Sequence, residues 1–181
     1  VSQEIYSTGK VTDKSEIGTY WWNEFQKAFN SAYGDSFETQ RKLEYESLKK
    51  TIEYFNSTAN AKELSDLMFA HWIKPPIFEE SKQFFEMCPV PIYVVSNIDR
   101  DDVLKAIEYH GLKPNGIFTS EDAKSYKPRK ELFQFALNST GLSAEQVVHI
   151  GDSLSSDVKG ASAVGINAIW INRSKREIPN G

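Results

Sequence analysis

The chain has 181 residues and a net charge of −4, with 40% hydrophobic and 25% charged residues, values that are typical of a folded protein rather than a disordered one. Acidic and basic residues are mixed along it, which argues against a nucleic-acid-binding face, and no apolar run approaches the roughly 20 residues that a membrane helix needs. The single cysteine, Cys88, excludes an intrachain disulfide and suits a reducing compartment. We therefore expect a cytoplasmic protein, a monomer or a homodimer, that binds neither nucleic acid nor membranes.

The sequence before its Pro-Pro pair is predicted to be helical throughout. Residues 15–33 form an expected helix, because apolar side chains recur at four-residue steps from Ile17 to Phe29. Two more helices are expected over residues 38–56 and 61–72. The aromatic residues of the first of these helices are expected to be mostly buried: Trp21, Trp22, Phe25 and Phe29.

After the Pro-Pro pair, short apolar strands alternate with helices. The strands are expected over residues 91–95, 116–119, 147–150 and 167–171. The helices are expected over residues 77–87 and 101–110, after Pro128, and through Val158 and Ala161. Such alternation predicts a parallel sheet with helices on its faces, and ligands bind at the carboxyl ends of the strands in such sheets.

Polar residues follow the first two of these strands. Ser96 and Asn97 would be ordinary in a turn with a helix cap, but a hydroxyl beside a helix N-terminus is also suited to bind a phosphate oxygen. Lys127 lies just before Pro128, which fits the first turn of the next helix. A lysine there is usually solvated, yet this loop is also where a mobile positive charge would neutralise a phosphoryl group.

Two carboxylates, Asp152 and Asp157, flank the turn after the third strand. The ordinary interpretation is a helix cap and a solvated acid. The alternative is a site for a hard cation, because Mg²⁺ takes oxygen ligands and is usually held by one or two carboxylates, water and substrate phosphate. Gly151, which precedes the pair, would let the backbone pass close to a ligand.

The order of these residues at three successive strand ends resembles the second, third and fourth motifs of the haloacid dehalogenase-like superfamily. Those motifs are a strand ending in Ser or Thr, a lysine at a helix start, and a strand followed by a paired-acid turn. The resemblance implies that Ser96 and Lys127 are catalytic and that, with Asn97, they bind the substrate phosphate. It also implies that Asp152 and Asp157 bind Mg²⁺.

The same resemblance implies a fold and a reaction. The expected class is α/β, with a three-layer Rossmann-like core built on a parallel sheet, residues 76–181, and an α-helical cap, residues 1–75. The implied reaction is magnesium-dependent hydrolysis of a phosphomonoester through an aspartyl-phosphate, with a small phosphorylated metabolite as substrate. Residues 170–173 resemble a stretch in pyrimidine nucleotide phosphatases, which favours a nucleoside monophosphate, with sugar phosphates and phosphoglycolate as close alternatives.

One motif of the superfamily has no match. It is an apolar central strand ending in Asp-x-Asp, whose first Asp attacks phosphorus, and residues 1–14 contain no such strand. Asp99-Arg100-Asp101 matches only superficially, because it already belongs to the second motif. We therefore expect that the central first strand is missing, that the sequence is a fragment, and that the chain by itself is inactive. The alternative is a degenerate relative.

Three other functions are compatible with parts of the pattern. A phosphatase-like binding protein would lack the nucleophile, and a haloacid dehalogenase would need no metal, although Gly151-Asp152 favours a phosphatase. Gly151-Asp152-Ser153-Leu154 also matches the motif of the GDSL serine esterases. That class needs a histidine base far downstream of the serine, whereas all three histidines precede Ser153.

Overall fold

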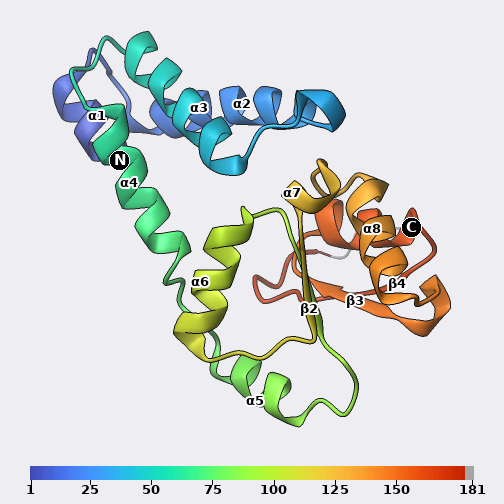
Figure 1. Cartoon of the computed structure of the whole chain (residues 1–181). Helices are drawn as coiled ribbons and strands as arrows, with labels where there is room; N and C mark the ends of the chain where they lie inside the picture. Colours follow the sequence, from blue (N-terminus) through green and yellow to red (C-terminus); the bar gives the residue numbers. More distant parts are fainter. Residues whose placement is uncertain (178–181) are drawn as a thin grey trace.

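The computed structural model describes residues 1–177, and the first part of the chain is helical (Figure 1). We call residues 1–74 the helical region. Its elements are α1 (Ser2–Thr8), α2 (Lys14–Ser31), the 3₁₀ turn η1 (Gly34–Ser36), α3 (Gln40–Tyr54) and α4 (Ala61–Trp72). These bounds confirm the three predicted helices to within a few residues.

Local sequence explains where these helices begin. The Asp13 side chain accepts a hydrogen bond from the backbone N–H of Ser15 at the start of α2. The Asn60 side chain does the same for Lys62 and Glu63 at the start of α4. Such side chains satisfy backbone donors that have no partner within the helix. The starts of α2 and α4 are therefore fixed by residues beside them in the sequence.

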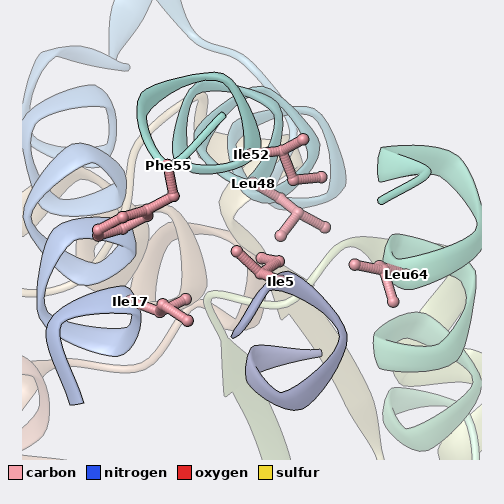
Figure 2. Close-up of a cluster of buried hydrophobic side chains, with 6 residues drawn as sticks. All are labelled: Ile5, Ile17, Leu48, Ile52, Phe55 and Leu64. Atoms are coloured by element: carbon pink, nitrogen blue, oxygen red, sulfur yellow. The ribbon is translucent and has the colours of Figure 1, made fainter. Parts of the chain in front are cut away.

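The helical region has a hydrophobic core to which all four α-helices contribute. Figure 2 shows side chains from α1, α2, α3 and α4 converging on one centre. The buried residues of this cluster are Ile5, Ile17, Leu48, Ile52, Phe55 and Leu64. Trp22 is the exception among the aromatic residues of α2 that were expected to be mostly buried, since it is 51% exposed. It adjoins Trp21 in sequence, and successive residues lie about 100° apart around a helix, so both rings cannot point into the same core.

We call residues 79–177 the strand region. Its strands are β1 (Tyr93–Ser96), β2 (Gly116–Thr119), β3 (Val148–Gly151) and β4 (Asn167–Trp170). Its helices are α5 (Glu79–Met87), α6 (Arg100–His110), α7 (Ser120–Ala123), α8 (Lys130–Thr140), the 3₁₀ turn η2 (Ala144–Gln146), the π-helix η3 (Leu154–Lys159) and α9 (Gly160–Ser162). All four predicted strands are present, and α7 and the π-helical form of η3 were not anticipated.

The strands form two separate parallel pairs rather than one sheet. β1 pairs with β2, and β3 pairs with β4. Within residues 1–177 no strand joins β1 to β3, which agrees with the expectation that the central strand is missing. The α/β class with parallel strands and an added helical region is therefore confirmed, whereas the division at residue 75 into two domains stays a prediction.

The pair β3–β4 has one covered face and one open face. On the covered face, Phe133, Ala161 and Ile166 form a buried cluster beneath the strands. Gly160 allows this packing, because a Cβ at that position would meet the Phe133 ring at 2.6 Å. The alternate side chains Val148, Ile150 and Ile169 are exposed.

Candidate functional site

The side chain of Lys127 links the two strand pairs. Its Nζ donates to the backbone carbonyl of Val95, next to the end of β1, at 2.8 Å. It also donates to Oδ1 of Asp157, in the turn after β3, at 2.7 Å. The Lys127 side chain is only 11% exposed. Residues predicted from three separate strand ends are therefore brought to one place, with Lys127 between them.

The carboxylate of Asp157 is held by three donors. Oδ1 accepts from Lys127 and from Nε2 of His149 at 3.1 Å, and Oδ2 accepts from the backbone N–H of Ser153 at 3.0 Å. Burial alone would raise the pKa of Asp157, but the His149 and Lys127 contacts and the Ser153 hydrogen bond outweigh it and hold the pKa well below its usual value. Asp157 is therefore ionised and paired with Lys127, and both of its oxygens are already engaged by the protein.

The backbone around Asp157 is shaped to bring its carboxylate under the strand end. Asp157 lies in the π-helix η3, and such single π-helical turns are frequent at functional sites. A Cβ on Gly151 would collide with the Asp157 carboxyl group, so only glycine fits at the end of β3. This is a different role for Gly151 from the close approach to a ligand that the sequence suggested.

Ser96 and Asn97 follow Val95, whose carbonyl binds Lys127, but their side chains are used differently. Oγ of Ser96 accepts a hydrogen bond from the backbone N–H of Ile98 at 3.1 Å. Asn97 binds the backbone of Lys127 at two points: its Oδ1 accepts from the Lys127 N–H at 2.7 Å, and its Nδ2 donates to the Lys127 carbonyl at 3.1 Å. The Asn97 amide thus fixes the lysine backbone, and its predicted contact with phosphate stays a prediction.

Asp152 offers an exposed carboxylate on a fixed backbone. Its carbonyl oxygen accepts from Nε1 of Trp170 at 3.0 Å and from Nη2 of Arg176 at 2.6 Å. Among residues 1–177 no group of three or more His, Cys, Asp or Glu side chains is placed to hold a metal. A single carboxylate still fits Mg²⁺, which keeps several waters and is often bound through one or two carboxylates and substrate phosphate. Asp157, engaged as described, fits such an ion less well.

One residue of this site, His149, was missed by sequence reasoning. It was considered only as one of the three histidines that precede Ser153. A signal for His149 was present: it stands two residues before Gly151, so both point to the same face of β3. Its contact with Asp157 depends on the turn geometry of η3 and could not be read from spacing.

Pro128 also differs from its predicted place. It lies in the turn that precedes α8, because the first helical residue is Lys130. Lys127 is thus held in a turn rather than directly at the helix start. The loop of residues 124–129 carries it.

Comparison with known proteins identifies the group to which this geometry is similar. The family model for haloacid dehalogenase-like hydrolases matches residues 4–171. The HAD-hydrolase YfnB of Bacillus subtilis is 37% identical over 84 residues, which are 45% of this chain and 36% of YfnB. The pyrimidine 5′-nucleotidase YjjG of Escherichia coli is 35% identical over 63 residues, 34% of this chain and 28% of YjjG. The aligned part thus spans about a third of the length of these curated relatives.

Solved structures share the fold. A magnesium-bound crystal structure of YfnB, described as revealing interdomain movement, superposes with a TM-score of 0.70 at 22% identity and covers 91% of this chain and 76% of that one. A dehalogenase crystal structure superposes with a TM-score of 0.74 at 16% identity and covers 97% of this chain and 80% of that one. At these sequence identities the structural similarity establishes the fold. It does not decide between phosphoester hydrolysis and dehalogenation.

Proposed function

The chain belongs to the haloacid dehalogenase-like hydrolase family, and we propose that its protein is a cytoplasmic, magnesium-dependent phosphomonoester hydrolase. The observation that carries the proposal is the Lys127 ammonium, held at the end of β1 by the Val95 carbonyl and by Asp157. A fixed, partly buried positive charge at the end of the strand that carries Ser96 suits an anionic group such as a phosphate. No described helix is long and apolar enough to cross a membrane.

In this proposal each residue of the site has a defined role. Lys127 neutralises charge on the phosphoryl oxygens, and Ser96 orients one of those oxygens. Asp157 and Asn97 hold Lys127 in place, through its ammonium and its backbone respectively. Phosphoryl transfer depends mainly on such positioning and charge stabilisation, because the transferred group carries most of its charge on oxygens.

Asp152 would hold the Mg²⁺ ion, with Asp157 contributing at most through a water molecule. When bound, the ion would add charge neutralisation at the phosphate oxygens. Asp152 suits this role because its carboxylate is exposed while its backbone is fixed by Trp170 and Arg176.

The proposed substrate is a small phosphorylated metabolite, with nucleoside monophosphates as the first class to test. Two observations support it. YjjG, one of the relatives, is a pyrimidine 5′-nucleotidase. The helical region also lies over the part of the strand region that carries α7, as expected of a cap (Figure 1). Sugar phosphates remain the close alternative.

The nucleophile is expected to come from an Asp-x-Asp strand that residues 1–177 do not supply. The chain alone should therefore give no turnover of p-nitrophenyl phosphate with Mg²⁺. A longer form that includes such a strand should hydrolyse it, and should rank nucleotides above sugar phosphates by kcat/KM. Turnover by the repurified 181-residue chain would show that another residue attacks. If the nucleotides rank far below the sugar phosphates, the substrate class is wrong while the phosphatase proposal stands.

Two further assays separate the alternatives. A dehalogenase would release halide from a 2-haloacid without added Mg²⁺. A phosphatase-like binding protein would bind a nucleotide in equilibrium dialysis and hydrolyse none, even in the longer form. The exposed carboxylate of Asp152 favours the phosphatase. A dehalogenase needs no metal ion, so a carboxylate suited to bind Mg²⁺ would have no function in it.

A further inference from the structure

The residue before Lys127 points away from the site and into the helical region. Tyr126 is 1% exposed, and its hydroxyl donates to the backbone carbonyl of Glu38 at 2.6 Å. Its ring packs against Phe29, with centroids 4.2 Å apart, and against Phe37 at 5.2 Å. Burial raises the pKa of the phenol, so the hydroxyl stays protonated and donates. Two adjacent residues of one loop therefore have different partners: Tyr126 binds the helical region, and Lys127 belongs to the site.

The rest of this loop is fastened to the same part of the helical region. The Gly34 N–H donates to the carbonyl of Lys124 at 2.8 Å. Arg129 donates from Nη2 to the carbonyl of Asn30 at 2.7 Å, and its guanidinium lies 3.9 Å from the centre of the Tyr33 ring. The segment from Asn30 to Glu38 thus covers the loop of residues 124–129 along its length.

On the side of the strand region, the loop is held at Lys127 by the two hydrogen bonds from Asn97. Its position therefore depends on both regions: Asn97 fixes the lysine backbone from below, and Tyr126 is fixed by the helical region from above. A shift of the helical region would pull on Tyr126 and, through one peptide unit, on Lys127.

We propose that Tyr126 is a positioning residue that couples the docking of the helical region to the placement of the Lys127 ammonium. Docking completes the site, and undocking releases the lysine from Val95 and Asp157. The consequence for catalysis rests on the proposed function. The coupling itself concerns only this chain's own contacts and holds whatever reaction the site performs.

A second contact between the regions lets the coupling be tested separately. The carboxylate of Asp99 accepts from the backbone N–H groups of Gln40 and Arg41 at 2.7 and 2.9 Å, at the N-terminus of α3, where a negative charge is favoured. The Arg41 guanidinium binds Asp102 through two hydrogen bonds of 2.7 and 2.6 Å. None of these hydrogen bonds involves the loop of residues 124–129.

The test measures how fast the Lys127 amine reacts in competitive reductive methylation, read by mass spectrometry against the exposed Lys62 in the same molecule. Tyr126→Phe keeps the ring and removes only the bond to Glu38. It should speed Lys127 labelling about fivefold, the factor that corresponds to the net loss of one buried hydrogen bond. Tyr109→Phe, at an exposed tyrosine, is the matched control and should change nothing.

A double-variant cycle separates coupling from general loosening. Asp102→Asn weakens docking at the second contact, so it should also speed Lys127 labelling, and this effect should largely vanish when Tyr126→Phe is already present. Additive effects, or no change in either single variant while circular dichroism shows a folded protein, would overturn the proposal. In a form that hydrolyses phosphoesters, Tyr126→Phe should lower kcat more than it raises KM. Absence of any turnover would count against the phosphatase proposal and leave the labelling result standing.

Discussion

The two regions of the molecule differ in how completely they bury their apolar side chains. In the helical region, the buried cluster around Leu48 is packed between α1, α2, α3 and α4 (Figure 2). In the strand region, Val148, Ile150 and Ile169 lie exposed on one face of β3–β4, and α5 has no buried residue at all. Parallel strands are normally covered on both faces, so the strand region is the one that depends on further packing.

This difference indicates where the stability and the chemistry of the chain reside. Helices close a core with their immediate neighbours in sequence, whereas a parallel sheet needs partners from distant segments. The proposed site lies in the less complete region and is held by charged and polar contacts rather than by a sealed core. Substitutions in the two regions should therefore fail for different reasons.

The largest loss of stability is expected from Asp157→Asn in the strand region. It leaves the Lys127 ammonium partly buried without its counter-charge, which should cost about 3–5 kcal/mol in the free energy of unfolding. The native pKa of Asp157 is depressed, so this contribution is complete above the unfolded value of 3.8 and is lost as the pH falls below it. Urea unfolding at pH 7 and pH 3 checks it: equal losses at both values would contradict the ion pair.

The second prediction compares the stability cost of removing an apolar side chain in the two regions. Leu48→Ala removes a side chain that is 1% exposed and should cost about 2–5 kcal/mol, because a cavity remains. Ile169→Ala, in the open face of the strand region, should cost well under about 1 kcal/mol. Urea midpoints with unchanged m-values would measure both. Similar losses at the two positions would mean that the face of β3–β4 is covered in solution.

A gain in stability is expected at Glu44, a buried acid of the helical region. Burial raises its pKa to about 7, and its Oε2 has no hydrogen-bond partner among the described residues. The folded state therefore holds the proton more tightly, and stability falls by up to about 3 kcal/mol as the pH rises from about 4.5 to about 7. Glu44→Gln should remove this fall and stabilise the chain at pH 8, with no gain at pH 4. Thermal unfolding across that range decides it, and a flat wild-type profile would refute it.

A smaller loss is expected at the contact between the regions. Asp102→Asn weakens the two-pronged bond with Arg41 and should cost about 1–3 kcal/mol, the range for hydrogen bonds to a charged group. Asp101→Asn changes the exposed neighbouring acid and is the matched control. Hydrogen exchange at the N-terminus of α3 should rise in the first variant alone. If both variants behave alike, the contact adds nothing specific.

The smallest effect on folding is expected from Asp152→Asn. Its carboxylate is exposed, so the free energy of unfolding should change by less than about 0.5 kcal/mol. The rise in melting temperature that millimolar Mg²⁺ gives in the presence of inorganic phosphate should nevertheless be reduced. An unchanged Mg²⁺ response would remove Asp152 from the metal site.

The sequence predicted the regular elements well because they depend on local periodicity. Ile17 and Phe25 recur at helical spacing and are buried, and all four short apolar runs after residue 90 are strands. The spacing could not show which of the aromatic residues of α2 is the exposed one, Trp22, because neighbouring positions on a helix differ by only about 100°. The four-residue helix α7 has too few residues to show any period.

For the site, the sequence predicted which residues gather at the strand ends but not how they pair. Lys127 and Asp157 were both named, yet their contact crosses thirty positions of sequence. The two bonds from Asn97 to the Lys127 backbone depend on a loop conformation that no residue pattern encodes. Tyr126 carried no signal, because an aromatic residue in a polar loop is as consistent with an exposed position as with a buried one.

The collision between a Cβ at Gly151 and the carboxyl group of Asp157 has a consequence for how this protein can change over evolutionary time. Gly151 cannot vary alone: any larger residue there requires a shorter one at position 157, which in turn frees Lys127 from its counter-charge. In a library of random variants, a Gly151→Ala clone should therefore regain folding only through a second change at residue 157 to Gly, because a Cβ at residue 157 would itself collide with the new one, and it would do so at the cost of the site.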